Sequence, residues 1–159
     1  MSQDLLNSVA VNYQDSAKML AETIMQFTPE QWTKGFNYFQ VPWKIAYHII
    51  DCLDYYFRPQ PEVEYQWGHR FGGGWWELPV DKIPAPETLV SYLYEIEERI
   101  EEHFSMLQDE ALVTPYDAGR EHGETRLEHY IYALRHTMHH HGALSQLSLC
   151  YGNPEGSWE

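Results

Sequence analysis

The fold is decided by the last long segment of the chain, residues 127–150, which reads LEHYIYALRHTMHHHGALSQLSLC. Its apolar residues recur every three or four positions, which is the period of an α-helix. Such a helix must place His136 and His140 on one face, because residues four apart are neighbours with Cβ atoms about 5–6 Å apart. Two imidazoles held one turn apart can bind one metal ion with little reorganisation. The segment therefore predicts a helix that carries two ligands of a metal site.

The sequence before this segment predicts three more long helices. The first covers residues 3–25, and the capping pattern of Thr28 and Gln31 predicts a short helical turn after it. The second runs over residues 42–57. Its inward-facing residues are expected to form a seam spaced by four and three: Val41, Ile45, His48, Cys52 and Tyr55.

The third helix begins at Pro86, a residue that suits the first helical position, and its acidic residues 95–102 form a solvated face. Thr125 and Glu128 match a capping box at the start of the last helix. No segment predicts a strand. We therefore expect an all-α fold, a four-helix bundle formed by a single domain over residues 1–159.

The composition limits the kinds of partner. Ten Lys and Arg against 24 Asp and Glu give a net charge of −14, which repels nucleic acid and anionic membranes. No apolar run approaches the roughly 18–20 residues of a membrane span, and the opening residues MSQDLLNSVA lack the features of a signal peptide. Two cysteines match a reducing compartment. These features predict a soluble, cytoplasmic protein with neither nucleic acid nor a membrane as partner.

The connection over residues 58–85 lies between the second and third helices. It contains several prolines and a triple glycine, so regular structure is not expected there. It also contains large aromatic residues, Trp67, Phe71, Trp75 and Trp76, which carry too much apolar surface for a solvated linker. We therefore expect an ordered loop that covers the site, with Trp75 and Trp76 as the main shielding residues.

A catalytic metal site usually has three protein ligands and an open position. His48 is the best candidate for the third, because it lies on the inward seam of the second helix. Asp51, one turn away, could accept the second ring N–H of His48, or it could be a solvated residue. Cys52 and Cys150 could approach the site, or they could be ordinary buried residues.

Two segments resemble the DinB/YfiT-like family of metal-binding helical proteins. VPWKIAYHIIDCLDYYF is similar to the family's aromatic, apolar, His, apolar, Asp pattern, and LRHTMHHHGALSQL is similar to its His-x-x-x-His-x-Gly-Gln pattern. The resemblance implies a four-helix bundle with His48, His136 and His140 as ligands. Gly142 matches the pattern, whereas Ala143 stands where the family has glutamine.

The remaining histidines have other predicted roles. His139 and His141 flank the pair on other faces and are expected at the surface or at an interface. His129 lies about 10 Å from His136 along the helix axis, too far to bind the same ion, so a hydrogen-bonded role is expected. Three more histidines carry weaker signals. His103 lies near a helix end, where it could meet the helix dipole, and His69 and His122 lie in loops.

A metal held by three histidines can lower the pKa of a bound water or thiol. The family resemblance implies a thiol-dependent S-transferase that uses a low-molecular-weight thiol, or else a hydrolase. The expected substrate is a small molecule that binds under the aromatic loop. The expected ion is zinc or nickel, with manganese and iron as alternatives. The alternative function is a non-catalytic, stress-related bundle that binds a ligand or a structural metal.

The last helix is apolar on two sides. One seam contains the histidines, and a second stripe lies nearly opposite it: Leu127, Ile131, Leu134 and Met138. One four-helix core covers a single side of each helix. We therefore expect a homodimer that pairs this stripe, or else coverage of the stripe by the long loop or by the turn after Thr28.

Overall fold

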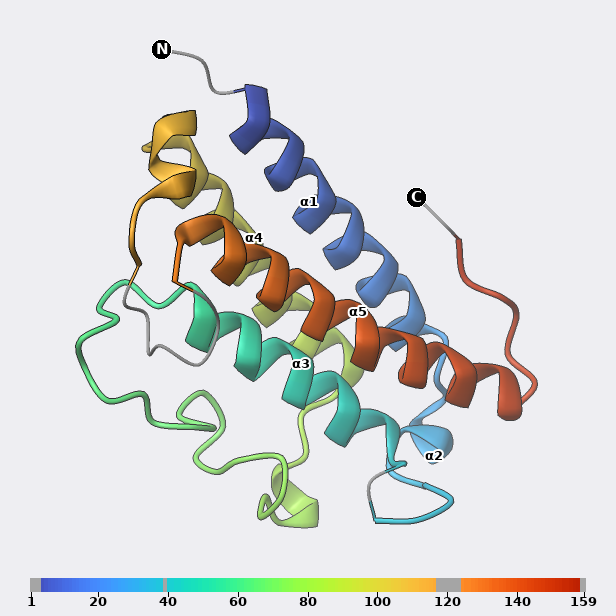
Figure 1. Cartoon of the computed structure of the whole chain (residues 1–159). Helices are drawn as coiled ribbons and strands as arrows, with labels where there is room; N and C mark the ends of the chain where they lie inside the picture. The colour runs from blue at the N-terminus through green and yellow to red at the C-terminus, as the bar shows by residue number, and fades with distance from the viewer. Residues whose placement is uncertain (1–3, 39, 117–123, 158–159) are drawn as a thin grey trace.

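The computed structural model describes residues 4–38, 40–116 and 124–157. Within these ranges all regular elements are helical and no strand forms, which confirms the all-α prediction. The long helices are α1 (Asp4–Met25), α3 (Pro42–Tyr56), α4 (Pro86–Ser105) and α5 (Arg126–Cys150) (Figure 1). The short elements are α2 (Pro29–Trp32) and the 3₁₀ turns η1 (Val80–Lys82) and η2 (Asp109–Val113).

The helices begin at the residues that the sequence signals indicate. Pro42 and Pro86 occupy the first turns of α3 and α4. At the start of α5 the Glu128 backbone N–H donates to Thr125 Oγ1, and the Thr125 N–H donates to the Glu128 carboxylate, which confirms the capping box. Thr28 caps α2 in the same way. These local contacts satisfy backbone donors that a helix start leaves without partners.

The four long helices pack side by side around a shared apolar core. Helix α1 contacts α4 and α5, and α3 contacts the same two helices from the other side. Figure 1 shows α5 lying between α1 and α3, with α4 behind. In the part of the chain that the structure describes, no helix is long and apolar enough to cross a membrane.

Helix α3 is buried on more than one side, which corrects the predicted inward seam. Ile45, His48 and Tyr55 are only half-buried. The innermost hydrophobic side chains are instead four that are entirely enclosed: Ala46, Tyr47, Ile49 and Ile50. The difference arises because α4, α5 and the loop over residues 58–85 all cover α3, so its apolar pattern has no single face. His48 therefore lies at the edge of the core, next to α5.

The buried face of α5 is also rotated from the predicted histidine seam. Ala143 and Cys150, both predicted to face inward, are exposed. The residues that face the core in their region include three that were not on the seam: Thr137, Leu144 and Ser148. His136 and His140 are half-buried and lie at the border of the core. The two predicted ligands on α5 are thus accessible from one side.

Gly142 is a destabilising residue within α5. It is exposed, and a Cβ atom placed on it would meet no atom within 4 Å. Gly142→Ala should therefore raise the free energy of unfolding by about 0.5–1 kcal/mol, because alanine loses less backbone entropy in a helix. Chemical denaturation measures this change.

A matched control is Gly68→Ala. Gly68 has a φ of 73°, and a Cβ atom there would lie 2.3 Å from Gly73 C. This variant should be destabilised, since the added atom overlaps backbone. A loss of stability in Gly142→Ala would contradict the open position found on α5.

Candidate metal centre

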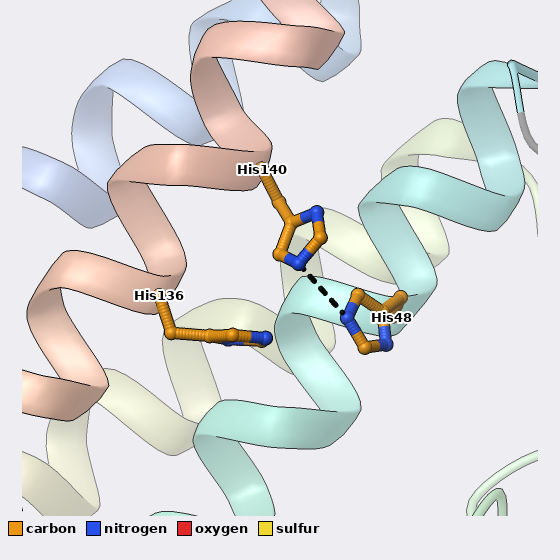
Figure 2. Close-up of side chains that lie close together, drawn as sticks. All are labelled: His48, His136 and His140. Atoms are coloured by element: carbon orange, nitrogen blue, oxygen red, sulfur yellow. Dashed lines mark hydrogen bonds between the residues drawn. The ribbon is translucent and has the colours of Figure 1, made fainter.

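Three imidazole rings from two helices meet at the border of the core. His48 comes from α3, and His136 and His140 come from successive turns of α5 (Figure 2). The Nε2 atoms of His48 and His140 are 3.3 Å apart. One nitrogen from each ring lies within 4.8 Å of the other two. The structure therefore brings together the three histidines that the sequence singles out.

The arrangement suits a divalent ion. Two nitrogens bound to one tetrahedral zinc at about 2.0–2.1 Å are roughly 3.4 Å apart, close to the observed His48–His140 separation of 3.3 Å. Within the described residues the cluster contains three ligand side chains, all half-buried. A set of three leaves a coordination position open, whereas structural zinc sites are closed by four ligands.

The surroundings keep the imidazoles in the form that binds metal. Burial, with the neighbouring His140 and His136 rings, lowers the pKa of His48 to about 3. Burial also lowers the pKa of His140, with a smaller contribution from His139. Both rings are therefore neutral near pH 7. A neutral imidazole has one nitrogen without a hydrogen, and this nitrogen can bind a metal ion directly.

Aromatic side chains border the three rings. The Trp75 ring centroid is 5.3 Å from that of His48, and Tyr56 and Tyr132 approach His136 at 5.8 and 6.3 Å. Trp76 is 42% exposed, and its neighbours include Trp75 at 5.7 Å. The loop over residues 58–85 thus places one of its two predicted shielding residues, Trp75, against a candidate ligand.

The two cysteines differ in position. Cys52 is buried and lies one turn along α3 from His48, with Sγ 3.7 Å from His48 Nδ1. Burial, together with the nearby Asp51, raises the pKa of the Cys52 thiol to about 12, so it keeps its proton at neutral pH. Cys150 is exposed at the end of α5, contrary to the buried role expected for it.

Asp51 and Asp54 fasten the long loop to α3. Asp51 is fully buried, and its carboxyl accepts a hydrogen bond from the Gly68 backbone N–H at 3.0 Å. The Tyr65 hydroxyl lies 2.9 Å from Asp51 Oδ1 and 2.8 Å from Asp54 Oδ2. Asp51 is therefore not a solvated residue, and its carboxyl group bonds to Tyr65 and Gly68 rather than to His48. Its contacts hold the loop.

The two carboxyl groups are in different protonation environments. Burial raises the pKa of Asp51. Burial alone would also raise the pKa of Asp54, but the Tyr92 hydrogen bond and the Arg99 charge outweigh it and lower that pKa. A phenol has one hydrogen, so Tyr65 can donate to only one of the two carboxyls. The raised pKa favours a proton on Asp51, and such a proton would supply the hydrogen for the second contact.

The remaining histidines have structural environments. His129 is buried and its Nε2 lies 3.1 Å from the Tyr56 carbonyl oxygen, as expected for a hydrogen-bonded residue. His139 is exposed, as predicted, but His141 is buried with its Nε2 2.9 Å from Thr23 Oγ1, so its predicted surface position is wrong. The His141 ring points toward α1 because α5 is rotated from the predicted seam.

Two other histidines also gain contacts that the sequence did not indicate. His103 Nε2 is 2.7 Å from the Tyr130 hydroxyl, and burial lowers the pKa of His103 to about 4. The ring is therefore neutral at pH 7 and lacks the charge that a helix-dipole interaction needs. His69 Nε2 lies 3.4 Å from Asp54 Oδ2. His122 lies outside the described residues.

Sequence reasoning missed the polar cluster around Asp54. This carboxylate contacts side chains from α4 and from the loop: Tyr65, His69, Tyr92 and Arg99. The one available signal was the pair of acidic residues within the apolar run IIDCLDYYF, since a charged residue among buried neighbours needs a partner. The partners themselves are distant in the sequence and could not be identified from spacing.

Comparisons of the chain with models of protein families, with curated proteins and with solved structures give no match. The functional reading of the site therefore depends on the geometry of its own residues.

The roles of Asp51 and Asp54 in holding the loop can be tested by replacing each with asparagine. Asp51→Asn should change the free energy of unfolding at pH 7 by less than about 0.5 kcal/mol, because an amide can donate to Tyr65 and accept from Gly68 as a protonated carboxyl group would. Asp54→Asn should cost about 1–3 kcal/mol, because Arg99 loses its anionic partner. Urea denaturation compares the two variants.

The raised pKa of Asp51 also predicts that the stability of the fold depends on pH. A raised pKa for Asp51 means that the folded state binds more protons than the unfolded state above the usual carboxyl pKa. The contribution of Asp51 to stability is therefore lost as the pH rises through its folded pKa, and Asp51→Asn should lack this loss. Equal destabilisation by both asparagine substitutions would show that Asp51 acts as an anion.

Proposed function

We propose that the chain is a divalent-metal-binding protein whose ligands are His48, His136 and His140, and that it is a metal-dependent enzyme. The observation that carries this proposal is the convergence of three imidazoles from α3 and α5. The similarity of the two histidine segments to DinB/YfiT-like proteins supports a four-helix bundle of that type. Zinc or nickel suits the all-nitrogen ligand set best.

The number of ligands favours a catalytic metal site over a structural one, because structural zinc sites usually have four protein ligands. The cluster holds three ligand side chains among the described residues, and these are half-buried. A divalent ion held in this way lowers the pKa of a bound water or thiol. The three imidazoles would hold the ion. The Trp75 ring lies against His48 and limits the access of water from that side.

The proposed reaction is the transfer of a low-molecular-weight thiol to a small electrophile, or the hydrolysis of a small molecule. The nearest protein thiol cannot serve as the nucleophile, because Cys52 is buried and its pKa is raised to about 12. A thiol reactant would therefore come from solution. This consideration favours thiol transfer with a free cosubstrate over covalent catalysis by a cysteine of this site.

Protein purified without a histidine tag should contain about one divalent ion per chain. His140→Ala should remove most of this metal, because two imidazoles bind a divalent ion far more weakly than three. Elemental analysis by mass spectrometry measures the content. His139→Ala is the matched control, since His139 is the exposed neighbour of His140 and should leave the metal in place.

The reaction is tested on the same samples. Metal-loaded protein is mixed with low-molecular-weight thiols and electrophiles, and the thioether products are measured, with hydrolysis of ester and amide substrates assayed in parallel. Turnover should be present in His139→Ala and lost in His140→Ala. A fully loaded protein that turns over none of these substrates would favour the alternative, a non-catalytic bundle with a structural metal. Equal metal loss in both variants would reject the three-histidine site.

We propose further that the chain forms a homodimer through α5. Ile131 is 51% exposed, and it borders an apolar groove of about 330 Å³ that is also lined by Leu127 and Leu134. The other residues that line this groove come from α1, from η2 and, at Tyr130, from α5, and none comes from the long loop or from α2. The stripe is partly exposed, because Leu127, Leu134 and Met138 are half-buried. A twofold axis would let it pair with its own copy.

Light scattering at micromolar concentration should therefore give the mass of two chains, and Ile131→Glu should give a folded, metal-loaded monomer, because a buried carboxylate has no partner at such an interface. Val80→Glu is the control: Val80 is 82% exposed and lies on η1, away from the groove. A wild-type monomer at this concentration would reject the dimer.

A further inference from the structure

Cys52 contacts the side of His48 that faces away from the other two rings. Figure 2 shows one ring nitrogen of His48 directed at His140 and the other directed away from both α5 histidines. The first is Nε2, which is 3.3 Å from His140 Nε2, and the second is Nδ1, which is 3.7 Å from Cys52 Sγ. The two residues are four apart on α3, so the thiol lies one turn from the ring.

This position rules out Cys52 as a fourth ligand of the proposed ion. The ion would bind at the Nε2 edge of His48, whereas Sγ lies at the Nδ1 edge. The set of side chains that can surround one ion includes the three histidines and not Cys52. The thiol can therefore affect the site only through the His48 ring.

The tautomer of His48 decides whether its Nε2 can bind a metal. A neutral imidazole carries one hydrogen, and a metal at Nε2 requires that hydrogen to be on Nδ1. The position of the hydrogen is set by the partner of the other nitrogen. At His48 the Nδ1 atom lies against Cys52 Sγ, whereas the carboxyl group of Asp51 is engaged by Tyr65 and Gly68.

We propose that Cys52 is a positioning residue that accepts the Nδ1–H of His48 and so holds His48 in the metal-binding tautomer and orientation. This inference rests on the proposed metal site and extends it to a residue outside the three ligands. A sulfur atom is a weak acceptor, but Cys52 is only 4% exposed, and water therefore competes poorly for the contact. The thiol also fixes the ring from one edge while Trp75 packs near it.

The test compares Cys52→Val, which replaces the thiol with a somewhat larger apolar group and removes the acceptor, with Cys52→Ser, which restores an acceptor. Metal affinity is measured by competition with a chelator. Cys52→Val should weaken binding by about 10-fold, the low end of the effect of residues that orient metal ligands. Cys52→Ser should bind within about threefold of the wild type. Cys150→Ala, which removes the exposed thiol at the end of α5, is the control and should leave the affinity unchanged.

A second readout does not require metal. Nitrogen-15 NMR of the metal-free protein should show the Nδ1–H form of His48 in the wild type and in Cys52→Ser, with a shift toward the Nε2–H form in Cys52→Val. The proposal is overturned if the wild type has the Nε2–H form, if Cys52→Val binds metal as tightly as the wild type, or if Cys52→Ser binds as weakly as Cys52→Val.

The two proposals fail in different ways. A wild-type protein that binds no divalent ion rejects the proposed function, but the NMR measurement still decides whether Cys52 sets the tautomer. If Cys52→Val does not fold, Cys52→Ala removes the same acceptor with a smaller volume, and the same two measurements apply to it. A metal-binding wild type with an unaffected Cys52 variant rejects the positioning role alone.

Discussion

The packing of α3 against α5 is the contact on which the candidate site depends. One ring comes from α3 and two come from α5, and a slip of one residue along a helix moves a side chain by about 1.5 Å and rotates it by roughly 100°. The register is fixed by a buried contact, in which His129 Nε2 lies 3.1 Å from the Tyr56 carbonyl oxygen. The Tyr56 ring then lies 5.8 Å from that of His136. His129, which is not one of the three candidate ligands, therefore helps to set the position of α5 relative to α3 at the site.

Buried polar contacts also place α1 relative to α5. Thr23 and His141 lie 2.9 Å apart in the core, and the Tyr13 hydroxyl donates to the Tyr130 carbonyl at 2.7 Å. Apolar packing alone would tolerate several rotations of α5, because the helix is apolar on more than one side. A buried hydrogen bond tolerates few rotations, since each lost partner costs about 1–3 kcal/mol. These contacts select the rotation that leaves His136 and His140 at the border of the core.

The elements of the fold could be predicted from the sequence because their signals are local. A capping box such as Thr125 with Glu128, or a proline such as Pro86 in a first turn, acts within a few residues of itself. The pair of His136 and His140 could be predicted for the same reason. His141 could not, because the side that a helix buries depends on the neighbours that surround it, and periodicity does not specify them. The same limitation applies to Asp54, whose partner Arg99 is 45 residues away.

The long loop and the candidate site share one helix, and this links the access to the site with the stability of the loop. Asp51 and Asp54 hold the loop through Tyr65, while His48 lies one turn before Asp51 on the same α3. The attached loop then brings Trp75 to the His48 ring. A rigid helix carries both attachments, so the position of Trp75 over His48 is determined by hydrogen bonds rather than by apolar contact alone. A change that releases the carboxyl contacts would therefore expose the ring edge without moving the three histidines.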